Sequence, residues 1–144
     1  MPKLTASLGL FLLIFLLFLF PSIANAQVVI NEFSSHSNPE WVEIYNAGSS
    51  VVSLQGHSIF FDDSTSTQKY DFCDSHQIGA NAYILITRPN NSYWLADGGD
   101  TLILKKDGEV LDLISYGQGG LFAPEATQSA TRSPEGGASW TITN

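Results

Sequence analysis

A chain of 144 residues is long enough for one folded domain and too short for two. Its 14 Asp and Glu residues outnumber its 6 Lys and Arg residues, which gives a net charge of −8 at pH 7. This balance argues against a nucleic-acid backbone or an anionic lipid surface as the main partner, because both are bound through clustered basic side chains.

The N-terminal segment has the three parts of a secretory signal peptide. A basic residue near the start is followed by an apolar run from Leu8 to Phe20, and Ala24-Asn25-Ala26 forms a small-x-small cleavage site. We therefore predict a hydrophobic signal helix over residues 1–26 and a mature domain over residues 27–144, secreted or held at the cell surface. A retained membrane anchor is the alternative, because the apolar segment is close to the shortest length that spans a bilayer.

The rest of the chain alternates short β-branched and aromatic runs with Gly, Pro, Asn and Asp, and it shows no helical period. The predicted strands are Val28–Ile30, Glu40–Tyr45, Val51–Leu54, His57–Phe61, Gln68–Phe72, Tyr83–Thr87, the two strands of a hairpin within Thr101–Ile114, and Ala138–Ile142. The stretch from Gly117 to Pro134 is predicted to be a long loop. About nine short strands with regularly spaced turns indicate an all-β, immunoglobulin-like β-sandwich.

The hairpin is the clearest local signal, because Asp107-Gly108 is a preferred two-residue turn between two alternating runs. This register pairs Lys106 with Glu109. It also pairs Leu104 with Leu111 and Leu102 with Leu113, so that four leucines would lie on one buried face.

Several ordered motifs resemble those of the prokaryotic lamin tail domain. Ile30–Phe33, Glu40–Asn46 and Val52–Ile59 are similar to its opening, and Gly99–Leu104, Asp112–Gly117 and Arg132–Trp140 are similar to its second half. The resemblance extends over essentially all of residues 27–144. It implies an immunoglobulin-like sandwich that acts as a binding or tethering module in exported proteins, and it brings no catalytic residues.

Aromatic residues outside the regular strand pattern are the candidate binding residues. Tyr93, Trp94 and Tyr116, with Phe60 and Phe61, include neighbours that cannot all point into the core. An exposed group of them would suit a glycan or a protein partner. The alternative is that Trp94 and one Phe close the open ends of the sandwich.

Acidic loops are weak candidates for a metal site. Asp97 and Asp100 could supply oxygen ligands to calcium, but their spacing matches no known calcium loop, and Asp and Gly are also the residues that turns require. The three histidines, His36, His57 and His76, lack the clustered spacing of a zinc site. We therefore expect no cofactor, with calcium as the ion to test.

Other polar residues are interpreted as structural. Glu32, Glu43 and Asn46 are expected to bind backbone groups at strand ends and loops, and Arg132 is expected to pair with a carboxylate. The single cysteine, Cys73, is interpreted as a buried small hydrophobic residue, with an interchain disulfide as the alternative. Asn90-Asn91-Ser92 is a glycosylation sequon.

Together these patterns predict a non-catalytic binding or tethering module outside the cytoplasm. Its expected partner is a protein or a glycan at the cell surface and not a nucleic acid, and membrane contact is expected only through residues 1–26 if they are retained. Two alternatives remain open. One is a structural surface subunit that assembles through strand edges, and the other is a small exported metal-assisted hydrolase built on the acidic loops.

Overall fold

The computed structural model describes residues 27–62, 67–88, 94–117 and 120–144. Over these residues the chain forms 11 strands and no helix. The strands are β1 (Val28–Ser34), β2 (Trp41–Asn46), β3 (Val52–Ser53), β4 (His57–Asp62), β5 (Thr67–Asp71), β6 (Gln77–Ile78), β7 (Ala82–Thr87), β8 (Gly99–Lys106), β9 (Glu109–Gly117), β10 (Ser129–Arg132) and β11 (Trp140–Thr143). The predicted signal helix lies outside the described residues, and within them no helix has the length and hydropathy to cross a membrane.

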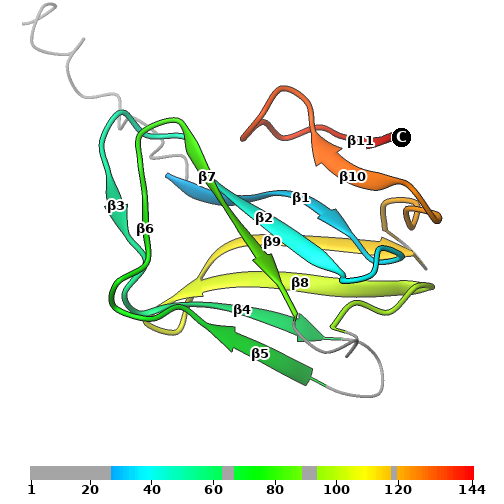
Figure 1. The fold of residues 1–144 in the computed structure, drawn as a ribbon, viewed down its shortest axis with the longest axis horizontal. Coiled ribbons are helices and arrows are strands. Elements are labelled where there is room, and N and C mark those ends of the chain that lie inside the picture. The colour runs from blue at the N-terminus through cyan, green and yellow to red at the C-terminus, as the bar shows by residue number, and fades with distance from the viewer. Residues whose placement is uncertain (1–26, 63–66, 89–93, 118–119) are drawn as a thin grey trace, which may run out of the picture.

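The strands form two main antiparallel sheets that face each other, as Figure 1 shows. A five-stranded sheet has the order β11-β10-β1-β2-β7, and a four-stranded sheet has the order β5-β4-β8-β9. The short pair β3-β6 lies at one end. The all-β prediction is confirmed, and two facing antiparallel sheets are consistent with an immunoglobulin-like sandwich.

The core lies between the two sheets and follows the alternation of the strands. Val42 and Ile44 of β2 are fully buried, as their period-two spacing predicts, and Ile59 of β4 with Leu102 and Leu104 of β8 meet them from the other sheet. Burial of an aliphatic side chain of this size stabilises the fold by about 1.5–3 kcal/mol. The apolar face of each strand therefore determines which side of each sheet turns inward.

Two of the 11 strands, β6 and β10, were not predicted, and β10 is the more important of the two. It lies inside the stretch from Gly117 to Pro134 that was predicted to be a loop, so that prediction is wrong over Ser129–Arg132. β10 is paired on one side with β1 and on the other with β11. Of its four residues only Ala130 is an apolar core residue, so β10 has too weak a pattern to be recognised. The second missed strand, β6, has two residues and pairs with β3.

The β8–β9 hairpin has the predicted turn but a different register. Lys106 pairs with Glu109, which confirms the prediction at the turn. A bulge then follows, so that Leu104 pairs with Asp112 and Leu102 with Ile114. The predicted face of four leucines is therefore wrong, because one extra residue in a strand moves all later side chains to the opposite face.

The bulge makes a testable difference between two neighbouring residues of β9. Leu113 is 51% exposed, whereas Ile114 packs against the core. We expect Leu113→Lys to change the free energy of unfolding by no more than about 0.5 kcal/mol, and Ile114→Lys to lower it by at least about 2 kcal/mol. Urea unfolding of both variants measures this. The opposite order of effects would support the unbulged register.

Candidate binding face

The predicted aromatic residues do not form an exposed patch. Trp94 is 7% exposed and stacks on Phe61, with ring centroids 4.9 Å apart. Tyr116 is 2% exposed, and its hydroxyl donates a hydrogen bond of 2.8 Å to the Ala96 carbonyl. Tyr93 and the sequon at Asn90 lie outside the described residues. Trp94 and Tyr116 are therefore core residues, which corrects the prediction that they could be exposed for a ligand.

Glu40, which was not among the predicted site residues, holds the segment that carries Trp94. The Glu40 side chain is buried, and its Oε2 accepts hydrogen bonds from the Trp94 and Leu95 amides at 2.5 and 2.9 Å. Its Oε1 has no hydrogen-bond partner among the described residues. Burial raises the pKa of the Glu40 carboxyl, and the two amide donors only partly oppose that shift.

This carboxyl group makes stability depend on pH. Because the folded pKa of Glu40 lies above its ordinary value of 4.5, the folded chain binds the proton more tightly than the unfolded chain does. The resulting stabilisation is fully present below pH 4.5 and is lost as the pH rises through the folded pKa. We expect Glu40→Gln to gain stability relative to the parent chain as the pH rises through this range. Urea unfolding at a series of pH values tests this, and a constant difference would contradict it.

The two weak metal candidates differ in exposure and in their partners. Asp97 is exposed, and its Oδ2 lies 3.7 Å from His36 Nε2. Asp100 is buried at the start of β8, where its Oδ1 accepts a hydrogen bond from the Thr101 amide. Among the described residues, no group of three or more His, Cys, Asp or Glu side chains could hold a metal ion.

Cys73 is exposed, so its interpretation as a buried hydrophobic residue is wrong. Its Sγ lies 3.1 Å from Ser75 Oγ, and this hydrogen bond is the main reason that the pKa of the thiol is lowered. Phe72, the residue before it, takes the buried position because alternate residues of an extended chain face opposite sides.

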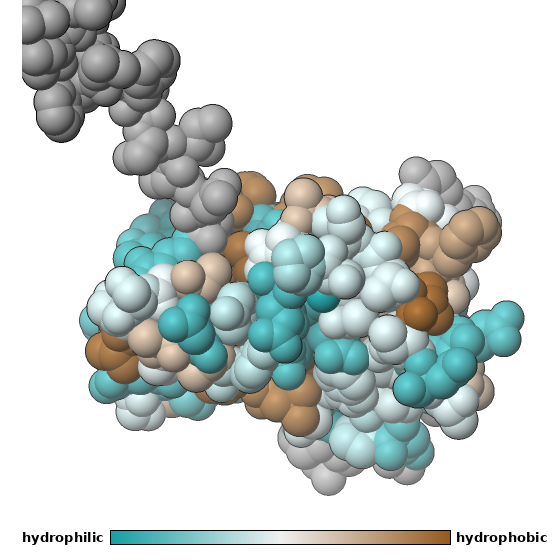
Figure 2. All heavy atoms as spheres, turned by 90° about the horizontal axis from the view of Figure 1, so that it is seen from above, coloured by the Kyte–Doolittle hydropathy of each residue, from teal (hydrophilic) through white to brown (hydrophobic). Residues whose placement is uncertain are grey.

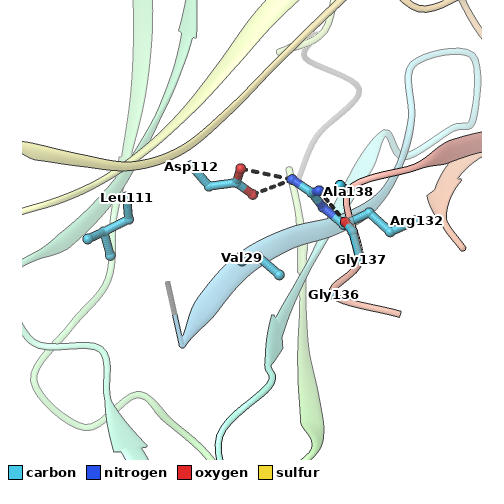
Figure 3. A pocket seen from close by; sticks show the side chains of 7 residues that line it. All are labelled: Val29, Leu111, Asp112, Arg132, Gly136, Gly137 and Ala138. Carbon is cyan, nitrogen blue, oxygen red and sulfur yellow. Dashed lines mark hydrogen bonds and ion pairs between the residues drawn. The ribbon is translucent and has the colours of Figure 1, made fainter. Parts of the chain in front are cut away.

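The predicted pairing of Arg132 with a carboxylate is confirmed. Arg132 Nη2 lies 2.8 Å from both oxygens of Asp112, and dashed lines mark these interactions in Figure 3. Its Nε donates to the Ile30 carbonyl, its Nη1 donates to the Gly137 carbonyl, and Asp112 Oδ2 accepts a hydrogen bond from the Ile30 amide. This pair therefore joins β10 and β1 of one sheet to β9 of the other, and we call it the inter-sheet ion pair.

A hollow of about 290 Å³ lies beside the inter-sheet ion pair. The residues that line it are Val29, Leu111, Asp112, Arg132, Gly136, Gly137 and Ala138. Both of its charged side chains already have partners inside the protein. The structure therefore supports a stabilising role for the inter-sheet ion pair.

Of Glu32, Glu43 and Asn46, which were expected to bind backbone groups, Asn46 does so. Its Nδ2 donates to the carbonyls of Ser50, Ile78 and Gly79, and its Oδ1 accepts from the Gly48 amide.

Glu32 and Glu43 are hydrogen-bonded to side chains instead. Glu43 accepts a hydrogen bond from Asn31 Nδ2 at 2.8 Å, and Glu32 accepts one from Ser129 Oγ. Glu32 and Glu43 lie directly opposite each other in β1 and β2, so both point to the outer side of the five-stranded sheet.

Aromatic and acidic side chains gather on this outer side. Tyr45 pairs with Tyr83, and Glu43 pairs with Leu85, so each pair projects from the same face of the sheet. The Tyr45 and Tyr83 rings lie 5.0 Å apart, and Tyr83 and Leu85 are 42% and 57% exposed. We call this surface the acidic aromatic face and define it by Glu32, Trp41, Glu43, Tyr45, Tyr83, Leu85 and Glu135.

The charge of the acidic aromatic face is negative. A hydrogen bond to Glu135 raises the pKa of Tyr83 to about 12. Burial raises the pKa of Glu43, and the nearby charges of Glu32 and Glu135 raise it further. The three carboxylates are therefore close enough to influence one another.

Among the described residues, Lys69, Lys105 and Lys106 belong to strands of the four-stranded sheet and not to this face. Lys69 and Lys105 lie over Phe60 on the four-stranded sheet, Arg88 lies over Trp94, and Arg132 is held against Asp112. Figure 2 shows separate hydrophobic patches among hydrophilic ones on the side of the molecule seen from above.

The acidic aromatic face could be predicted only in part. The alternation within Glu40–Tyr45 places Trp41, Glu43 and Tyr45 on one face of the strand, but their neighbours on β7 follow only from the strand pairing.

Comparison with known proteins gives one family. The family model described as Lamin Tail Domain matches residues 21–118. The match includes β1 to β9, whereas β10 and β11, with the Arg132–Trp140 motif, lie beyond it. No curated protein matches the chain.

Proposed function

The chain belongs to the lamin tail domain family, and on that basis we propose that residues 27–144 act as a non-catalytic module that binds or tethers a partner outside the cytoplasm. The location is supported by the signal-peptide pattern of residues 1–26. The partner that we propose is a protein or a glycan at the cell surface.

The acidic aromatic face is the observation that carries this proposal. Tyr83 and Leu85 expose large side chains opposite Tyr45 and Glu43, and Trp41 projects from the same face of β2. Aromatic side chains with polar neighbours are typical of recognition surfaces, because a ring offers a large contact area at a low cost in conformational entropy. The sandwich holds these side chains on neighbouring strands, which fixes their spacing.

The test is saturable binding of the full chain to a panel of immobilised cell-surface glycans and envelope proteins. We expect Trp41→Ala to weaken binding by about tenfold or more. The control is Leu113→Ala, which changes an exposed residue on the opposite sheet and should bind as the parent chain does. Equal binding by Trp41→Ala and the parent, or no saturable binding to any ligand of the panel, would contradict the proposal.

A further inference from the structure

Strand β7 is an open edge of the five-stranded sheet. It is the last strand in the sheet order, and within the described residues it pairs only with β2. In an antiparallel pair, every second residue directs its N–H and C=O groups away from its neighbour. These backbone groups of β7 face outward, next to the exposed side chains of Tyr83 and Leu85. In Figure 1 the β3-β6 pair lies near one end of β7, but it forms a sheet of its own and is not hydrogen-bonded to β7.

The β7 edge lacks the features that normally prevent a free edge from pairing. Its six residues, Ala82–Thr87, include no charged residue and no proline, and its register with β2 is continuous. Both edge strands of the four-stranded sheet have such protective features. β5 contains the charged residues Lys69 and Asp71, and β9 contains Glu109 and pairs with β8 through a bulge. An uncharged edge of this length has the properties of a docking site for another extended chain.

The charges beside β7 indicate which kind of chain fits. Glu43 lies directly across from Leu85, and Glu135 is hydrogen-bonded to Tyr83. A second copy paired through the same edge would bring these carboxylates towards their equivalents, which like-charge repulsion opposes. A chain with basic side chains would instead place positive charge beside them.

We propose that β7 binds an extended basic segment of a partner protein by strand addition. This inference rests on the proposed function and specifies its partner class. Backbone hydrogen bonds to β7 hold the segment, and alternate side chains of the segment lie over Tyr83 and Leu85. The aliphatic stems of lysine or arginine cover these two residues, while their charged ends reach towards Glu135 and Glu43.

The experiment uses a short blocked peptide in which lysine and valine alternate, added to the purified full chain. Hydrogen exchange of the β7 amides and titration calorimetry are measured together. We expect saturable binding that slows exchange at the outward amides of Ala82–Thr87 and that weakens as salt is added. A peptide in which glutamate replaces lysine should not bind.

Two matched variants locate the site. Leu85→Lys adds a positive charge at the edge and should weaken binding by about tenfold or more. Leu113→Lys is the control, because Leu113 lies on the other sheet and its exposed fraction of 51% is close to the 57% of Leu85. This variant should bind the peptide as the parent chain does. Equal losses in the two variants, or equal binding of the glutamate peptide, would overturn the proposal.

Two further outcomes separate this inference from the proposed function. Slow exchange of the β7 amides without peptide, together with a dimer in sedimentation, would assign the edge to a second copy and overturn the inference. Failure of the lysine peptide, while a panel ligand still binds through Trp41, would overturn strand addition and leave the proposed function in place.

Discussion

Replacing Asp112 with alanine is expected to lower the free energy of unfolding by about 3–5 kcal/mol, because the buried Arg132 guanidinium then loses its carboxylate. The Arg132 and Asp112 side chains are only 9% and 13% exposed. The substitution also removes the acceptor of the Ile30 amide, so a backbone donor loses its partner as well. Urea unfolding of the parent chain and the variant measures the difference.

The chain offers a matched control for this prediction in an exposed ion pair. Lys69 Nζ lies 2.7 Å from Asp71 Oδ1, but the two side chains are 46% and 65% exposed. Asp71→Ala should therefore cost no more than about 1 kcal/mol. The double variant Asp112→Leu with Arg132→Met should be more stable than Asp112→Ala, since it leaves no unpaired charge. Equal costs for Asp112→Ala and Asp71→Ala would show that the inter-sheet ion pair does not hold the sheets together.

Trp94→Ala is expected to cost about 3–5 kcal/mol of stability, because it leaves a large cavity in the core. The indole stacks on Phe61 and lies edge-on to Tyr70, with ring centroids 4.9 and 5.6 Å apart. The Trp94 amide is also held by Glu40, so the backbone cannot easily close around the space. The measurement is urea unfolding followed by circular dichroism, since the substitution removes a fluorescent side chain.

Phe122→Ala is the control for this substitution, because Phe122 is 86% exposed and lies in a loop. It should change the free energy of unfolding by no more than about 0.5 kcal/mol. The prediction also separates the two interpretations of Trp94. A Trp94→Ala variant that keeps its stability but loses a partner would contradict the core role and return Trp94 to the binding site.

Features that depend on neighbours in the sequence were predictable. Val42 and Ile44 are buried because alternate residues of a strand face one side, and the Asp107-Gly108 turn forms because both residues adopt positive φ. The nine predicted strands all lie at strands of the structure, and the ordered motifs indicated the family that the comparison shows. The outward position of Trp41, Glu43 and Tyr45 followed from the same alternation.

The acidic aromatic face was only partly predictable. Alternation in β2 groups three of its residues, but Tyr83 and Leu85 join them through pairing with β7, and Glu135 joins through a turn near the C-terminus. Trp94 and Tyr116 were candidates because aromatic residues outside regular strands serve both in cores and in binding sites. Only the position of Phe61 and of the Ala96 carbonyl shows that these two are buried.

By itself, the sequence determined the all-β class, the buried face of β2 and the family, since these depend on short-range periodicity and on ordered motifs. The tertiary structure alone decided the bulge in β9, the existence of β10 and the pairing of Arg132 with Asp112. Each of these depends on groups far apart in the chain: Asp112 accepts a hydrogen bond from the amide of Ile30, 82 residues away, and β10 forms between β1 and β11. A local pattern carries no information about such partners, because backbone and charged groups form hydrogen bonds and ion pairs with the groups that the fold places next to them.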